Sequence, residues 1–205
     1  MSFITDANMT AISGAIRAAE ARTKGEIVTV VAHASNAYLW QTLSCAALAA
    51  FVIPGLIGPF VGLVSSGDLF FVQLLALVVP ECPLLIPAVR FALVPGAIKR
   101  ANARRCAREQ FLVHGLHRTQ GRTGVLIFVS VCERYVEILA DDGINAKVDQ
   151  GEWQGIVDAF VADVRAQRVA DGFISAVAKV GDLLARHVPA EARNPDELPN
   201  KLFII

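Results

Sequence analysis

The chain has 205 residues, with 19 basic and 19 acidic side chains, and 54% of its residues are hydrophobic. This balance disfavours a strongly basic nucleic-acid-binding protein, and the hydrophobic content disfavours a disordered chain. The charges are unevenly distributed, because only Asp68, Glu81 and Arg90 are charged between residues 39 and 95. The composition therefore indicates an ordinary soluble domain interrupted by an apolar, membrane-like segment, and it disfavours a wholly soluble enzyme.

The N-terminal segment has the pattern of a folded domain. Apolar residues at helical spacing predict a helix over Asp6–Thr23, with Thr5 or Asp6 as its cap and Gly25 after its end. The next segment, Glu26–His33, is rich in valine and isoleucine and predicts a strand. The first twenty residues lack the basic start, apolar run and cleavage site of a signal peptide.

A transmembrane helical hairpin is predicted over residues 39–95. Leu39–Val64 contains 26 uncharged residues, and Leu69–Val89 follows after a four-residue polar turn. Glu81 lies about half-way along the second span, among three prolines. A carboxyl group at that depth is protonated, paired or near water. Two interpretations stay open: a protonated Glu81 bonded to carbonyls that the prolines free, or a proton or ion relay in a small transport element.

Basic residues predict the orientation of this hairpin. The turn between the spans has no lysine or arginine, whereas basic residues precede the first span and follow the second one closely. The positive-inside rule therefore places both termini and the soluble domain in the cytoplasm. The cluster after the second span is predicted to contact anionic lipid headgroups rather than nucleic acid. Its members are Lys99, Arg100, Arg104, Arg105 and Arg108.

The second half of the chain alternates helical and strand patterns. Two strands separated by two residues predict an antiparallel hairpin, and the first strand, apolar throughout, is expected to be central in its sheet. Two amphipathic helices follow, and the apolar end of the tail is expected to dock on a core edge or at the membrane interface. The predicted elements are a helix over Ile98–His114, strands at Gly124–Val131 and Arg134–Ala140, and helices around Trp153–Val164 and Phe173–Leu184.

This order of elements predicts an α/β fold. We expect a three-layer α/β/α sandwich with a small mixed sheet, interrupted by the two-helix transmembrane hairpin. The α/β domain would be discontinuous, comprising residues 1–38 and 96–190. The hairpin would occupy residues 39–95, and residues 191–205 would form a C-terminal tail.

The candidate site is Asp141-Asp142, at the exit of the second hairpin strand. Adjacent carboxylates are suitable ligands for Mg²⁺ or Ca²⁺, and Glu26 would be a third ligand if the sheet brings it close. The same Asp-Asp-Gly sequence is typical of a turn, and an aspartate can also accept a phosphoryl group. The sequence leaves these three interpretations open.

The remaining motifs give little indication of a catalytic or metal-binding site. His114 and His117 are three residues apart and would form a metal pair only if the helix continued through Gly115. Ser130 and Thr123 have no basic partner at a recognisable spacing, and no glycine-rich phosphate-binding run is present. The four cysteines, which lack metal-binding spacing, do not predict a disulfide framework. They are Cys45, Cys82, Cys106 and Cys132.

Three segments together resemble the TPM-domain family: ISGAIRAAEARTKGEIVTVVA, then GRTGVLIFVSVCERYVEILADDGI, then EWQGIVDAFVADVRAQRVADGFISAVAKVGDLLARHVP. That family includes thylakoid-lumen acid phosphatases, a photosystem II repair protein and many bacterial membrane proteins. The resemblance implies an α/β/α sandwich and, in some members, weak phosphatase activity with divalent ions held by acidic loop residues. This chain differs in carrying its apolar segment after the first strand, and in the loop sequence ADDGINAKV.

Two functions follow from this reading. The first is a bacterial, membrane-anchored interaction or scaffold module at the cytoplasmic surface, with the lipid bilayer and a membrane-associated protein as partners, no nucleic acid, and Ca²⁺ or Mg²⁺ as an optional ion. The alternative is a weak divalent-metal-dependent phosphatase of the TPM type.

Overall fold

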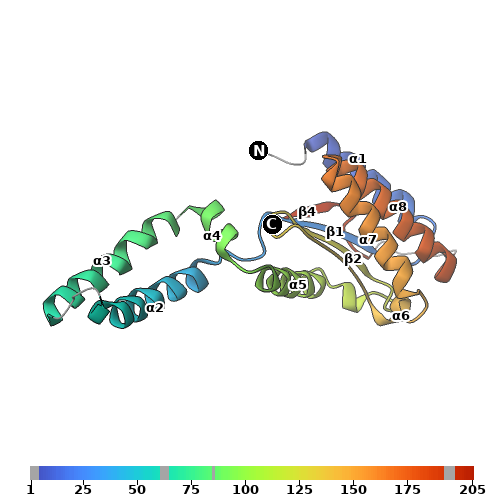
Figure 1. The fold of residues 1–205 in the computed structure, drawn as a ribbon. Helices are drawn as coiled ribbons and strands as arrows, with labels where there is room; N and C mark the ends of the chain where they lie inside the picture. Colours follow the sequence, from blue (N-terminus) through green and yellow to red (C-terminus); the bar gives the residue numbers. More distant parts are fainter. Residues whose placement is uncertain (1–4, 61–64, 85, 192–196) are drawn as a thin grey trace. The chain divides into compact units, whose positions relative to one another are not determined.

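The computed structural model describes residues 5–60, 65–84, 86–191 and 197–205, without the side chains of residues 41, 59, 66 and 78–84. The chain divides into two compact units. Residues 1–35 and 101–205 form one of them, called here the α/β unit, and residues 36–100 form the other, called the hairpin unit (Figure 1).

The α/β unit is built on a four-stranded mixed sheet in the order β3-β2-β1-β4. β1 pairs in parallel with both β2 and β4, whereas β2 and β3 are antiparallel. The predicted α/β class, the small mixed sheet, the β2–β3 hairpin and the central place of β2 are confirmed. The strands are β1 (Ile27–Ala32), β2 (Val125–Ser130), β3 (Tyr135–Ala140) and β4 (Leu202–Ile204).

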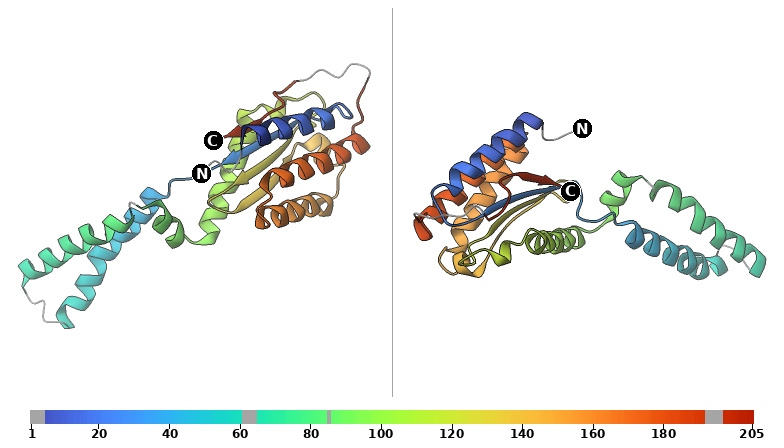
Figure 2. Two further views of the ribbon diagram at one scale, coloured as in Figure 1. Left: turned by 90° about the horizontal axis from the view of Figure 1, so that it is seen from above. Right: turned by 180° about the vertical axis from the view of Figure 1, so that it is seen from behind.

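Helices cover both faces of this sheet (Figures 1 and 2). One face carries α1 (Asp6–Glu20), α7 (Gln150–Arg165) and α8 (Val169–His187), which bury the larger apolar core. On the other face, α5 (Gly96–Val113) places Ala107 against Val28 and Phe128 of the sheet. The alternation of apolar residues along β1 and β2 supplies both cores, which is why these two strands are buried throughout.

Side chains cap the starts of two helices, and the cap at Thr5 is one of the two that the sequence predicts for α1. Thr5 caps α1 by accepting a bond from the Asn8 amide at 3.3 Å, and Asp149 caps α7 by accepting one from Gly151 at 2.7 Å. α1 ends at Glu20, three residues before the predicted end. At this end of α1 the Glu20 carboxylate accepts a bond from the Ile27 amide at 2.8 Å, which ties the helix to the start of β1.

The C-terminal tail contributes a strand of the sheet. β4 lies beside β1 with Thr29 opposite Leu202, and Leu202 is buried in the larger core. The expectation that the apolar end docks on a core edge is therefore confirmed. Before this strand, the amides of Glu197 and Leu198 are both bonded to the carboxylate of Glu26.

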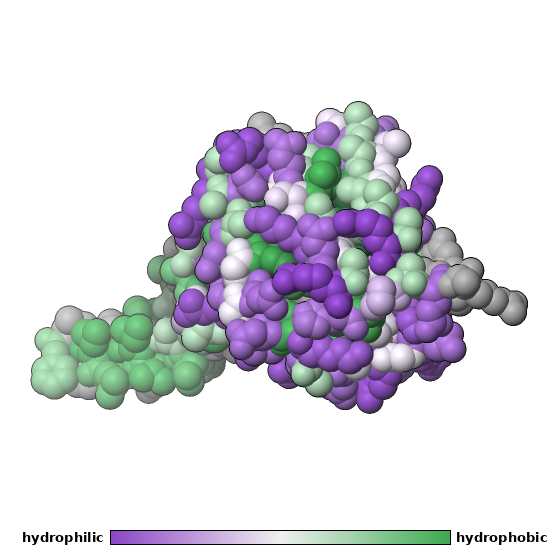
Figure 3. All heavy atoms as spheres, turned by 90° about the vertical axis from the view of Figure 1, so that its right-hand side faces the viewer, coloured by the Kyte–Doolittle hydropathy of each residue, from purple (hydrophilic) through white to green (hydrophobic). Residues whose placement is uncertain are grey.

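The hairpin unit contains two long helices that lie side by side in every view (Figures 1 and 2). Many of its large apolar side chains are exposed, and the hydropathy colouring is green over this unit (Figure 3). No helix in the described ranges is both long and apolar enough to cross a membrane. The transmembrane assignment of residues 39–95 therefore stays a prediction. The elements are α2 (Leu39–Ile57), η1 (Gly58–Phe60), α3 (Ser66–Leu84) and α4 (Pro87–Leu93).

Candidate functional site

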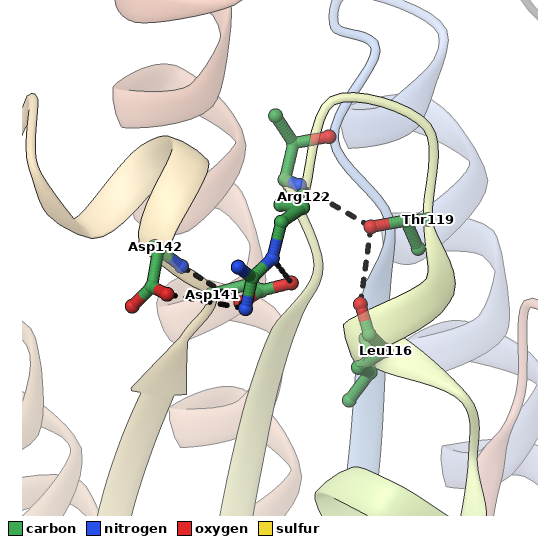
Figure 4. Close-up of polar contacts among 6 residues, drawn as sticks. Leu116, Thr119, Arg122, Asp141 and Asp142 are labelled. Atoms are coloured by element: carbon green, nitrogen blue, oxygen red, sulfur yellow. Dashed lines mark hydrogen bonds and ion pairs between the residues drawn. The ribbon is translucent and has the colours of Figure 1, made fainter.

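The loop that leads into β2 is fixed by its own hydroxyl groups (Figure 4). Thr119 Oγ1 donates to the carbonyl of Leu116 at 3.1 Å and accepts from the amide of Thr123 at 3.2 Å. Thr123 Oγ1 donates to the carbonyl of Lys24 at 3.3 Å. Both threonines are buried, so their hydroxyls hold the loop in place rather than facing solvent.

Backbone packing brings this loop close to the segment after β3. A Cβ atom added at Gly143 would lie 2.1 Å from the carbonyl oxygen of Gly121. Arg122, the residue after Gly121, has a φ of 54°, a left-handed conformation that is uncommon for a non-glycine residue. The two loops therefore form one rigid edge at the amino ends of β1 and β2.

Arg122 joins the two aspartates predicted from the sequence. Its Nη2 lies 2.9 Å from Asp141 Oδ1 and 3.1 Å from Asp142 Oδ2, and its Nε lies 3.3 Å from Asp141 Oδ2 (Figure 4). The hydrogen bond and charge of Asp141, followed by the charge of Asp142, raise the pKa of the Arg122 guanidinium. Asp141 is 5% exposed, whereas the side chain of Asp142 is 80% exposed.

Asp141 also has a structural role, because it caps the short helix α6 (Asp142–Asn145) by accepting from the Asp142 amide at 2.8 Å. The segment after Asp141 therefore forms a short helix, and the Asp142 carboxylate in its first turn is accessible. The site thus offers one exposed carboxylate beside a half-exposed guanidinium. A cation bound there would share Asp141 and Asp142 with Arg122.

Glu26 is buried and takes part in a different set of contacts. Its two carboxylate oxygens accept bonds from the Glu197 amide at 3.3 Å and the Leu198 amide at 3.2 Å. Within the described ranges, no group of three or more His, Cys, Asp or Glu residues could hold a metal ion. The metal site at Asp141, Asp142 and Glu26 stays a prediction.

The two candidate histidines have partners other than Arg122, Asp141 and Asp142. His114 stacks on Phe203 of β4 with ring centroids 4.1 Å apart, while His117 Nε2 accepts from Arg118 Nε at 3.2 Å. Burial, followed by the charge of Lys201, lowers the pKa of His114. Glu81 belongs to α3, but its side chain lies outside the described part.

A second polar cluster, which sequence reasoning missed, lies at the opposite end of β2. Ser35 Oγ is bonded to Ser130 Oγ at 2.8 Å, Ser130 Oγ in turn to the Glu133 carboxylate, and the Ser35 amide donates to Glu133 at 3.0 Å. Ser130 and Glu133 are buried. Spacing alone did not indicate this cluster, because Ser35 reaches it only through the parallel pairing of Ala32 with Ser130.

Comparisons with known proteins agree with this fold. Residues 88–183, from α4 to the last turns of α8, match the family described as the TPM domain. The NMR structure of the BA42 protein from the psychrophilic bacterium Bizionia argentinensis is similar over 100% of this chain and 97% of its own, with a TM-score of 0.64 and 20% identity. No curated protein matches significantly. At that identity the structure supports the fold alone, and the identification is limited to the family match: residues 88–183 of this chain are similar to the TPM domain.

Proposed function

We propose that this chain is a membrane-anchored interaction module, in which the hairpin unit enters the bilayer and holds the TPM domain at the cytoplasmic surface. The observation that carries the proposal is the exposure of large apolar side chains on the hairpin unit. Most such residues in the described part belong to this unit, including Trp40, Leu48, Phe51, Leu56, Phe60, Phe70, Phe71 and Leu75.

These side chains need an apolar environment. Burying one Leu or Phe side chain contributes about 1.5–3 kcal/mol, so leaving many of them in water is costly. Monomeric soluble proteins rarely expose apolar patches of this extent. The segment contains no Asp, Glu, Lys or Arg between Glu26 and Asp68, which favours lipid over a polar protein surface as its surroundings.

The orientation is part of the same proposal. Basic residues follow the second predicted span closely, and the turn Ser65–Asp68 carries none. The positive-inside rule therefore favours a cytoplasmic α/β unit. From there the domain would bind a membrane-associated protein.

Binding fits the α/β unit better than hydrolysis does. Thr119 and Thr123 use their hydroxyls to hold the loop, and Asp141 is engaged by Arg122. Nucleophilic catalysis needs a hydroxyl or carboxylate that faces a substrate beside a base. An interaction role places no such demand on these residues.

Membrane anchoring can be tested in the full chain with a charged substitution. An arginine at the centre of a span costs about 2.5–3.5 kcal/mol of insertion free energy. We expect Phe51→Arg to reduce the fraction of chain that stays in membranes after alkaline carbonate washing. Val113→Arg, on α5, is the control, because Val113 is also an exposed apolar residue, at 73% against 60% for Phe51. Complete release of the unsubstituted chain by carbonate would refute the anchor.

The cytoplasmic orientation requires a separate measurement. A reporter enzyme active only in the cytoplasm, fused after Ile205, is expected to be active. A second reporter, active only outside the cytoplasm, is expected to be silent in the same position. The reverse pattern would refute the orientation without affecting the anchor.

A divalent cation and weak phosphatase activity form a second candidate function. The supporting observation is the 80% exposed carboxylate of Asp142 beside Asp141, within a TPM domain. Weak oxygen sites bind Ca²⁺ in the millimolar range. We therefore expect Ca²⁺ or Mg²⁺ titration to shift the NMR signals of Asp142 and its neighbours, and Asp142→Asn to remove the shift. The absence of both this shift and turnover of a chromogenic phosphate ester would exclude the second function.

A further inference from the structure

The two edges of β1 are paired unequally. On the side of β2, all six residues of β1 are in register with a partner, whereas β4 matches only Thr29, Val30 and Val31. β4 is the outermost strand of the sheet on this side (Figure 2). It belongs to the C-terminal segment 197–205, called here the tail strand segment, in which Leu202 alone is buried. The outer edge of β1 is therefore covered by a short strand that buries little of its own surface.

Backbone groups hold the tail strand segment at both of its ends. The Glu26 carboxylate accepts bonds from the amides of Glu197 and Leu198. At the other end, the Ile205 amide donates to the carbonyl of Val31 at 2.9 Å. Any extended segment presents backbone groups of this kind, which is why sheet edges bind peptides by adding a strand. These contacts would therefore hold a strand of another sequence as well.

A buried hydroxyl group beside this strand is left unsatisfied. Thr29 of β1 is fully buried, and its hydroxyl oxygen has no hydrogen-bond partner within the described ranges. Its neighbours in register are Ile127 of β2 and Leu202 of β4, and residues directly opposite each other in a sheet project to the same face. Both neighbours are aliphatic and offer the hydroxyl no bond. Because an unpaired buried hydroxyl is costly, the tail strand segment covers this edge without fully satisfying it.

We propose that the outer edge of β1 is the partner-binding site of this domain, and that it takes an extended protein segment with threonine or serine opposite Thr29. The tail strand segment occupies the edge until the partner segment replaces it in the same parallel orientation. The hydroxyl of the incoming residue bonds to the Thr29 hydroxyl, as in cross-strand threonine pairs. This inference rests on the interaction role proposed above, and it gives that role a surface and a class of partner.

A second copy of the chain is the less suitable occupant. Its tail carries the same leucine opposite Thr29, so it makes no contact that the chain's own tail lacks. At equal contacts, a segment that is joined to the site is favoured over a free one by its effective concentration. A foreign segment with a hydroxyl at that position adds a bond that neither tail can make.

Peptides patterned on residues 197–205 test the proposal on the full chain in detergent. The chain carries Leu202→Asp, which would bury a charge in the larger core and so keeps its own tail from docking. One labelled peptide carries Leu202→Thr, and its matched control carries Leu202→Val, which has nearly the same shape without the hydroxyl. Fluorescence anisotropy is expected to show that both bind, the threonine peptide about threefold to tenfold more tightly.

Two further chains check this preference. Adding Thr29→Val to the Leu202→Asp chain should abolish it, because the recognised hydroxyl is gone. The unsubstituted chain should bind both peptides more weakly, because its own tail competes for the edge. Equal affinity of the two peptides for the Leu202→Asp chain would overturn the proposed recognition of a hydroxyl.

A second measurement does not depend on an undocked tail. In full chains that carry Leu202→Thr or Leu202→Val, hydrogen exchange of the Ile205 amide reports how often β4 separates from β1. We expect this amide to exchange several-fold more slowly in the Leu202→Thr chain, and the difference to vanish when Thr29→Val is added. Equal exchange in the two chains would overturn the proposal even if the Leu202→Asp chain failed to fold.

The outcomes separate this inference from the membrane anchor. If neither peptide binds a Leu202→Asp chain that is folded by circular dichroism, the partner site is overturned, and retention in carbonate-washed membranes would leave the anchor standing. Release by carbonate together with a preference for the threonine peptide would overturn the anchor and support the partner site. A full-length dimer in detergent that Leu202→Asp dissociates would identify a second copy as the occupant and overturn the partner class proposed here.

Discussion

The two units of this chain use apolar residues in opposite ways. In the α/β unit, Phe160 and Phe173 are buried and pack edge-to-face with ring centroids 4.8 Å apart. In the hairpin unit, Phe70 and Phe71 form a comparable edge-to-face pair at 5.9 Å, yet both are more than half exposed. The same residue type thus stabilises the first unit through burial within the chain, whereas the second unit would gain most from its surroundings.

The largest expected effect is the difference in unfolding free energy lost when one ring is removed from each of these two aromatic pairs. Phe173→Ala removes a fully buried ring and is expected to lower the free energy of unfolding by about 3–5 kcal/mol, as core phenylalanine truncations do. Phe71→Ala, at a 68% exposed position, should change it little in detergent. Urea unfolding of the two full-length variants in the same detergent measures the difference. Equal losses would contradict the division between an internally packed unit and an externally stabilised one.

Periodicity was sufficient to predict much of the α/β unit. The strands β1 to β3 and the helices α7 and α8 were indicated because each buries a regular set of apolar residues in the core. β4 was not predicted as a strand because its three residues become one only through pairing with β1. Local sequence carries no signal for such a partner, which lies more than 170 positions away.

At the candidate site, too, contacts between distant segments could not be predicted from local sequence. The sequence indicated Asp141 and Asp142, since adjacent acidic residues before a glycine are visible locally. It did not indicate Arg122, because that residue meets the aspartates only after β2 and β3 pair and bring the two loops together. Glu26 was a third ligand only on the condition that the sheet brings it close to the aspartates, which the sequence could not decide. Its carboxylate accepts bonds from the backbone amides of Glu197 and Leu198, contacts that no residue pattern reveals.

Two glycine-to-alanine substitutions test how closely atoms pack around the backbone in each of the two units. Gly143→Ala would place a methyl group against the Gly121 carbonyl, so we expect a loss of about 1–3 kcal/mol, as for overpacked cores. Gly55→Ala, in α2 of the hairpin unit, has no atom within 4 Å of the added carbon and should be neutral or slightly stabilising. Thermal unfolding followed by circular dichroism compares them. A destabilising Gly55→Ala would show that the hairpin unit is packed more tightly than its exposure indicates.

A smaller effect is expected at the Arg122 loop. Asp141→Ala removes the cap of α6 and should cost about 1 kcal/mol, because a helix cap contributes roughly that amount. Asp142→Ala alters a largely exposed carboxylate next to it and should stay within about 0.5 kcal/mol. Denaturant unfolding gives both values. If Asp142→Ala were the more destabilising, the exposed carboxylate would have a structural role, and it would be a less suitable candidate for binding a cation.

The smallest expected effect is a pH dependence of the α/β unit that is linked to His114. Burial and the nearby Lys201 lower the pKa of His114 below its ordinary value of 6.5, so the unfolded chain takes up this proton more readily than the folded one. Stability linked to His114 is therefore full above about pH 6.5 and declines as the pH falls through the lowered pKa. Melting temperatures measured between pH 7.5 and 5 should fall less steeply for His114→Gln than for the unsubstituted chain. An unchanged slope in His114→Gln would show that the stacking of His114 on Phe203 does not depend on the neutral ring.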